Sequence, residues 1–178
     1  MKLKTTDFRD LIFIEHELFK DERGFFKETF KKQVLEDFLG YKVNFCQDNQ
    51  VQSFKNSLRG LHFQNYPHQQ AKLISISIGK ILDVAVDLRK KSSTYGKYFA
   101  CYLSDSDHRS LFIPRGFAHG YLTLSEKATV NYKVDNYYCK EAEEGIPFND
   151  NKLNINWNIE LNKILISNKD INHKKYNW

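Results

Sequence analysis

The sequence contains little cysteine, and its cysteines lie far apart. Cys46, Cys101 and Cys139 are odd in number, and none of them belongs to a CxxC pair. This spacing argues against a disulfide framework and against a cysteine-based zinc site. We expect three free thiols.

The sequence also lacks a long apolar run. A membrane-spanning helix needs about 18 or more consecutive apolar residues, and no such run is present. The charged start Met1-Lys2-Leu3-Lys4 leads into polar residues without the apolar core of a signal peptide. We therefore expect a cytoplasmic protein with no membrane partner.

No linker divides the chain. The 178 residues include only 3 Pro and 8 Gly, and no segment rich in proline, glycine and serine separates one part from another. We therefore expect one domain over residues 1–178.

The net charge of +5 is spread along the sequence. The densest basic cluster is His173-Lys174-Lys175, in a polar tail. A dispersed charge indicates a solvated surface and no nucleic-acid partner. The same balance would suit an anionic small molecule.

Aromatic and alternating apolar residues favour strands. The expected strands are residues 12–15, 72–78, 81–89, 98–103, 110–113, 120–124 and 129–134. Only residues 29–39 have apolar residues at helical spacing, and Gly40 supplies a stop. Short strands separated by turn residues predict a mostly β protein, as a sandwich or barrel.

Two of these strands have informative faces. In residues 81–89, Val84, Val86 and Leu88 alternate with polar residues, so we expect one face in the core and the other face polar. In residues 129–134, Tyr132 shares a face with two valines. Its hydroxyl should therefore point inward and needs a partner or a ligand.

Lys72 has the parity of Ile74 and Ile76 in the strand of residues 72–78. A lysine on a buried face needs an anionic partner, a lowered pKa or a solvent-filled cavity. The alternative is that Lys72 begins the strand and extends to the rim.

Four residues could act together on a substrate. His62, Lys72, His119 and Tyr132 combine bases of near-neutral pKa, a cation and a weak phenolic acid. This set suits proton transfer at carbon.

A series of short motifs runs along the chain. They are Asp21-Glu22-Arg23-Gly24-Phe25-Phe26, Gln47-Asp48-Asn49, residues 58–64, residues 83–89, residues 113–120, Asn136-Tyr137-Tyr138 and Lys169-Asp170. Through these motifs the sequence resembles the dTDP-4-dehydrorhamnose 3,5-epimerase family of dTDP-L-rhamnose synthesis. The resemblance implies a cupin-like antiparallel jelly roll with a few short helices, acting without a metal or other cofactor.

The resemblance also assigns catalytic roles. His62 would be the general base, oriented by Asp170, and Tyr132 would return a proton from the opposite face of the sugar. A hydrogen beside a ketone is weakly acidic, so the developing enolate needs a donor, and Lys72 would supply it.

Substrate binding is implied for a larger set: Arg23, Glu28, Gln47, Asp48, Asn49, Arg59, His119, Glu144 and Lys169. Arg23 and Glu28 would reach a neighbouring subunit, because the family exchanges N-terminal strands in a homodimer. Taken alone, residues 47–49 would indicate a loop, and His119 would indicate a structural histidine.

Three other functions remain open from the sequence. A cupin-like metal enzyme would need a second histidine near His62, where Gln64 stands, and Gln64 is a poor ligand for a transition metal. A related enzyme could invert only C3 or C5, or move the keto group. A silent sugar-nucleotide or nucleic-acid binding module would not need the full catalytic set.

Overall fold

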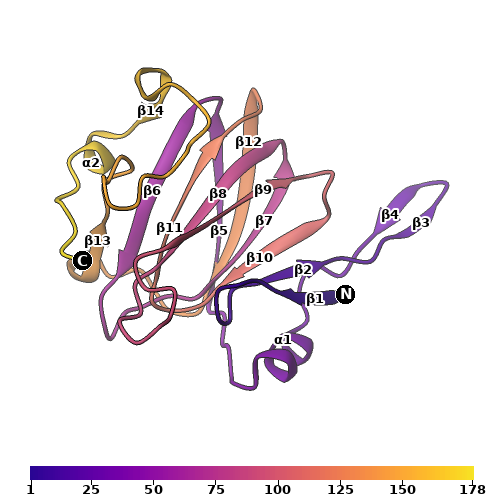
Figure 1. The fold of residues 1–178 in the computed structure, drawn as a ribbon. Coiled ribbons are helices and arrows are strands. Elements are labelled where there is room, and N and C mark those ends of the chain that lie inside the picture. The colour runs from indigo at the N-terminus through magenta and orange to yellow at the C-terminus, as the bar shows by residue number, and fades with distance from the viewer.

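The computed structural model describes residues 1–178. They form two six-stranded sheets and a separate two-stranded hairpin (Figure 1). The first sheet has the order β1 (Lys2–Thr5), β2 (Ile12–Glu15), β10 (Arg109–Ile113), β7 (Lys72–Ile78), β12 (Lys127–Val134) and β5 (Gln47–Phe54). The second has the order β13 (Glu143–Gly145), β6 (Ser57–Gln64), β11 (Phe117–Thr123), β8 (Lys80–Asp87) and β9 (Tyr98–Ser104), and β14 (Leu165–Ile166) pairs with β6.

The remaining elements are short. The hairpin consists of β3 (Phe19–Asp21) and β4 (Gly24–Phe26), and the helices are α1 (Lys32–Leu39), α2 (Asn168–Ile171) and the 3-10 turns η1 (Lys140–Ala142) and η2 (Leu161–Lys163). All strand pairs are antiparallel except β14 with β6. The prediction of a mostly β, cupin-like jelly roll is confirmed. No helix has the length and apolar character needed to cross a membrane.

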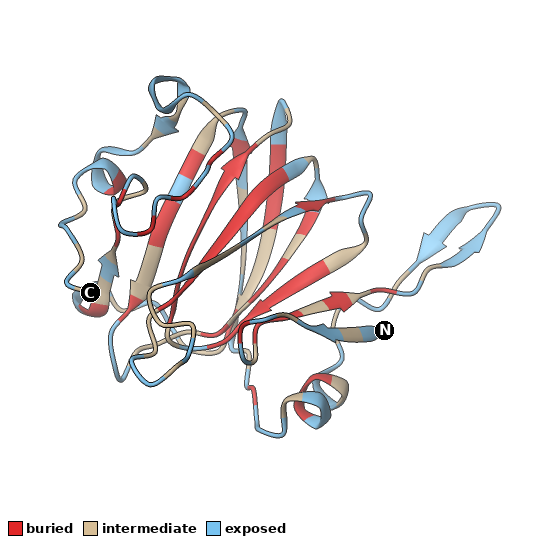
Figure 2. Ribbon diagram, in the orientation of Figure 1, coloured by how far each residue is buried: buried red, intermediate tan, exposed pale blue.

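The inner faces of the two sheets form the main core. Ile74 and Ile76 of β7 pack in one apolar cluster with Ile81 and Ala85 of β8. Each of these side chains is almost completely buried, so the interior strands are red along most of their length in Figure 2. The face of β7 that carries the isoleucines is therefore the inner face, as the alternation predicts.

The outer face of the second sheet is also covered. Val84 and Val86 of β8 pack with Trp157 and Ile155 of the C-terminal segment. The expectation that one face of residues 81–89 is polar and the other is core is therefore wrong in part. Both faces are buried, and the carboxylate Asp83 points inward with no exposed area.

Helix α1 covers part of the outer face of the first sheet. Leu35 packs with Ile12, Ile14 and Leu73. The helix begins at Lys32, later than the predicted residue 29, because the residue before it has extended backbone angles. Gly40 ends the helix in the left-handed region with φ 76°, as predicted.

Strands β1, β6, β13 and β14 lie outside the predicted set, as do two further segments. Residues 47–49 begin β5, whose exposure alternates although most of its side chains are polar. The hairpin of β3 and β4 projects away from the sandwich, and all its residues are exposed (Figures 1 and 2). Neither segment has the apolar alternation that marks a half-buried strand.

Candidate active site

Both sheets contribute side chains to an interior cavity of about 300 Å³. Its lining is Val51, Arg59, His62, Lys72, His119, Gly120, Tyr121, Val130, Tyr132, Ser167, Lys169 and Asp170. The structure thus brings together all four predicted catalytic residues. Three predicted binding residues, Arg59, His119 and Lys169, lie with them.

His62 lies on β6 and is held by a carboxylate from the C-terminal helix α2. His62 Nε2 lies 2.7 Å from Asp170 Oδ1, and the Gly60 N–H donates to Asp170 Oδ2 at 3.2 Å. Ser167 caps α2 by accepting the Asp170 N–H at 3.1 Å, which fixes where the carboxylate points. The pair leaves His62 Nδ1 free to accept a proton.

The pKa of Asp170 reflects this pairing. Burial raises the pKa, but the hydrogen bond and charge of His62 and the Gly60 N–H outweigh it, so the net pKa lies below the usual value. Asp170 is only 4% exposed. An ionised carboxylate here stabilises the imidazolium that forms when His62 takes a proton.

Gly60 is needed beside His62 because two strands approach closely there. Gly60 has φ 112°, and a Cβ on it would lie 2.6 Å from the Cα of Gly120. Gly120 in turn leaves no room for a side chain, because its Cβ would lie 2.6 Å from the Arg59 carbonyl oxygen. These glycines let β6 and β11 place His62 opposite His119 in the strand register.

Lys72 lines the cavity from β7, so the prediction that it faces the interior is confirmed. Burial lowers the pKa of Lys72 to about 8, while the nearby charges of Asp83 and Glu143 partly counteract the effect. The ammonium is therefore cationic near neutral pH without a tight ion pair. Such a group can stabilise a negative charge that develops on a bound substrate.

Tyr132 faces the same cavity from β12 and packs against the inner core, which confirms its predicted inward orientation. Burial raises the pKa of Tyr132, and the Arg59 charge opposes this only in part. The phenol therefore keeps its proton near neutral pH. His62 and Tyr132 belong to opposite sheets and reach the cavity from its two sides.

His119 pairs with a residue that the sequence analysis did not assign to the site. Its Nε2 lies 2.9 Å from Asp83 Oδ2, and Asp83 is fully buried. The other carboxylate oxygen of Asp83 has no hydrogen-bond partner. A carboxylate within the valine-rich strand β8 was the signal that could have identified it, because a buried charge requires a partner.

Glu144 lies apart from this cavity, whereas its neighbour Glu143 pairs with Lys169, which lines the cavity. Glu143 accepts hydrogen bonds from the Tyr138 hydroxyl and pairs with Lys169. Glu144 instead accepts from Asn65 Nδ2 at 2.9 Å and lines a separate outer hollow. Adjacent residues of a strand point to opposite faces, so a shift of one position moves the carboxylate out of the site.

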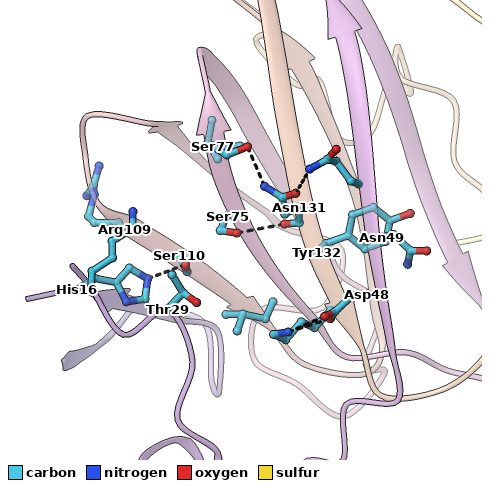
Figure 3. Close-up of a pocket in the computed structure, with 15 residues that line it drawn as sticks. His16, Thr29, Asp48, Asn49, Ser75, Ser77, Arg109, Ser110, Asn131 and Tyr132 are labelled. Carbon is cyan, nitrogen blue, oxygen red and sulfur yellow. Dashed lines mark hydrogen bonds and ion pairs between the residues drawn. The ribbon is translucent and has the colours of Figure 1, made fainter. Parts of the chain in front are cut away.

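None of residues 47–49 lines the interior cavity. Gln47 Nε2 donates to Asn49 Oδ1 at 2.7 Å, whereas Asp48 pairs with Lys133 on the outer face of the first sheet. Asp48 lines a hollow of about 390 Å³ on that face, and Asn49 and Tyr132 also line this hollow (Figure 3). This hollow is larger than the interior cavity, but His62, Lys72 and Asp170 do not line it.

Arg23 and Glu28 do not line the interior cavity. Arg23 forms an ion pair with Asp21 at the tip of the hairpin, and Glu28 pairs with Lys31 beyond the hairpin. Both partners lie in the same N-terminal segment. The hairpin extends away from the sandwich that contains the cavity (Figure 1).

The jelly-roll fold and the titratable side chains in its cavity are those of a cupin-like protein, and comparison with known proteins identifies the class as an isomerase. Residues 5–177 match the family model described as dTDP-4-dehydrorhamnose 3,5-epimerase, and the chain belongs to this family.

Several known proteins are similar over nearly their whole length. The dTDP-4-dehydrorhamnose 3,5-epimerase of Shigella flexneri is 45% identical over 99% of this chain and 96% of its own. The crystal structure of the enzyme of that name from Elizabethkingia anophelis is 44% identical with a TM-score of 0.96, over 99% of this chain and 96% of that one. The Legionella pneumophila dTDP-6-deoxy-D-glucose-3,5-epimerase, solved with dTDP-4-keto-L-rhamnose, is 40% identical with a TM-score of 0.92, over 98% and 92%.

Proposed function

We propose that this protein converts dTDP-4-keto-6-deoxy-D-glucose into dTDP-4-keto-L-rhamnose by inverting C3 and C5. The observation that carries the proposal is the convergence of His62, Lys72 and Tyr132 on one cavity, with Asp170 behind His62. The family relationship supplies the substrate class.

The first step is proton removal beside the ketone. His62 Nδ1 takes the proton, and Asp170 stabilises the resulting imidazolium through Nε2. The electron pair moves onto the ketone oxygen, where the Lys72 ammonium stabilises the enolate. Because the substrate carries its own ketone and the protein carries the acid and base, we propose a reaction without a metal or other cofactor.

The second step returns a proton from the other side of the ring. Tyr132 is placed for this role because it reaches the cavity from the sheet opposite His62 and its raised pKa keeps it protonated. A proton removed on one face and returned on the other inverts the carbon. The enolate then becomes a ketone again, the His62 imidazolium releases its proton to solvent, and the tyrosinate is reprotonated from solvent.

The diphosphate needs cations near the catalytic groups. Arg59 is oriented by Ser53, whose Oγ accepts its Nε–H at 2.9 Å, and Lys169 lies at the cavity beside Glu143. Both suit phosphate oxygens. His119, Gln47 and Asn49 would add directed hydrogen bonds from the neighbouring strands.

We propose a homodimer in which Arg23 and Glu28 complete the site of the partner. Phe19, Phe25 and Phe26 of the hairpin are each more than half exposed, at 53%, 55% and 64%. Apolar groups gathered on a projecting hairpin indicate a protein contact. We also propose a cytoplasmic location, because all three cysteines are free thiols.

The position of Gln64 argues against the metal-enzyme alternative. Its amide donates to the carbonyl oxygens of His68 and Tyr137 and accepts the Cys139 N–H at 2.7 Å. Gln64 therefore supports the chain around the cavity, and it is not available beside His62 as a ligand.

Product analysis tests the proposed reaction. The purified protein should convert dTDP-4-keto-6-deoxy-D-glucose into a sugar inverted at both C3 and C5, as identified by NMR after reduction of the ketone. A product inverted at one carbon would establish a single-centre epimerase. A product with the keto group moved would establish a ketoisomerase, and unchanged substrate would contradict the proposal.

A further inference from the structure

A second histidine lies behind the pair of His62 and Asp170. His173 Nε2 is 3.5 Å from Asp170 Oδ1, and the two imidazole rings meet edge to face with centroids 5.4 Å apart. The His173 side chain is only 10% exposed, and its buried Nε2 has no hydrogen-bond partner. A buried ring nitrogen without a partner is costly, so it points to a ligand.

The ring of His173 is held in place by close packing. It lies against the backbone of Gly145, where an added Cβ would be 2.2 Å from the ring. Gly145 pairs with His62 in the strand register of β13 and β6. The same strand pair therefore fixes both imidazoles relative to Asp170.

We propose that His62, Asp170 and His173 form an inhibitory site for a divalent transition-metal ion such as Zn²⁺. One nitrogen or oxygen of each residue lies within 4.8 Å of the others. Zinc bonds of about 2.0–2.2 Å place tetrahedral ligands about 3.5 Å apart, so small side-chain movements would complete the site. Two imidazoles and one carboxylate favour Zn²⁺ over Mg²⁺ or Ca²⁺.

His173 lies between Asp170 and the outer surface. His173 lines an outer hollow of about 580 Å³ formed with Gly145 and the C-terminal segment. His173 does not line the interior cavity that contains Lys72 and Tyr132. His173 therefore connects Asp170 to the outer hollow, away from the cavity proposed for the substrate.

The expected inhibition rests on the proposed role of His62 as the base. It follows because a bound ion changes which ring nitrogen carries the proton. In the pair with Asp170, the neutral ring carries its proton on Nε2 and leaves the Nδ1 lone pair free. An ion bound at Nε2 displaces that proton, and the neutral ligated ring holds one proton on Nδ1 instead. Nδ1 then cannot accept a proton from the substrate.

The test measures metal binding and inhibition separately. Isothermal titration of the chelator-treated protein with Zn²⁺ should detect a site that His173→Phe lacks, since phenylalanine keeps an aromatic ring but no nitrogen. His68→Ala removes a histidine outside the site and should bind as the wild type does. Because calorimetry needs no substrate, it tests the site even if the proposed reaction is wrong.

In assays, Zn²⁺ should lower kcat without raising KM, EDTA should restore the rate, and Mg²⁺ should have no effect. His173→Phe should keep a kcat close to that of the wild type while the inhibiting Zn²⁺ concentration rises about ten-fold or more. His173→Asn provides a second variant if the phenylalanine ring prevents folding. Equal Zn²⁺ binding and inhibition in wild type and both variants would overturn the proposal, as would no Zn²⁺ binding to the wild type.

Discussion

His62 Nε2 and Asp170 Oδ1 lie 2.7 Å apart, although 108 positions separate the two residues in the sequence. Asp170 is carried to β6 by the C-terminal segment that packs over the second sheet, and the Gly60 N–H holds its second oxygen. The C-terminal helix α2, which carries Asp170, therefore sets both the orientation and the tautomer of the proposed base.

Lys72→Met should stabilise the protein while removing its activity. At pH 7 the lysine is charged in both the folded and the unfolded chain, and only the folded chain bears the cost of burying the charge. We expect the free energy of unfolding to rise by about 1–3 kcal/mol in urea denaturation. Turnover should fall by about 100-fold or more, as for other lost oxyanion donors.

Lys91→Met is the matched control, because Lys91 is exposed. It should change neither the urea midpoint nor the rate. An unaltered rate in Lys72→Met would show that Lys72 does not stabilise the enolate.

The same lysine should set the alkaline limb of the pH profile. The charged form is the active form, and burial lowers the Lys72 pKa to about 8. The value of kcat/KM should therefore be retained below pH 8 and should fall as the pH rises through about 8, approaching ten-fold per pH unit. A profile that stays flat to about pH 9.5 would contradict this assignment.

Tyr132→Phe should separate exchange from inversion. The base can still remove a proton, but the acid on the opposite face is missing, while the shape of the cavity is nearly unchanged. In heavy water, deuterium should enter from the His62 side with retained configuration at the carbon that Tyr132 serves, which the family resemblance suggests is C5. NMR of the recovered sugar measures both properties.

Tyr66→Phe is a suitable comparison, because Tyr66 is 86% exposed. It should produce the doubly inverted sugar at the normal rate. If Tyr132→Phe does the same, water or another side chain is the acid.

Mixing two inactive variants should restore activity if the hairpin completes the partner's site. Arg23→Ala lacks the hairpin cation, and His62→Ala lacks the base, so each homodimer should have low activity. In a mixed dimer, one site has an intact base and receives Arg23 from the other subunit. Random subunit exchange should therefore restore about a quarter of wild-type activity. No recovery, with mixed dimers verified by mass spectrometry, would argue against a shared site.

The sequence pattern predicted β7, β10 and β12 well because their apolar alternation is regular. Ile74 and Ile76 alternate with serines, and β7 has the predicted bounds of residues 72–78. The pattern failed where a strand is largely polar or where a strand has two buried faces. Polar residues such as Gln47 and Asn49 leave β5 without apolar alternation. Asp83 made one face of β8 resemble a solvated surface.

The inward positions of the proposed catalytic residues were easier to predict than the positions of the proposed binding residues. Lys72 and Tyr132 contradict the apolar pattern of their own strands, so each is visible locally. Glu143 could not be distinguished from Glu144 because the choice depends on how β13 pairs with β6. The position of His173 beside Asp170 depends on the path of the C-terminal segment, which carries no periodic signal.

Deuterium incorporation tests the central claim most directly. The wild-type protein and His62→Ala should each be incubated with dTDP-4-keto-6-deoxy-D-glucose in heavy water, with nucleotide binding measured in parallel. The wild type should place deuterium at both C3 and C5 of the inverted product, whereas His62→Ala should bind the nucleotide normally and exchange neither position. Wild-type exchange rates in His62→Ala, or an inverted product without deuterium, would contradict the account.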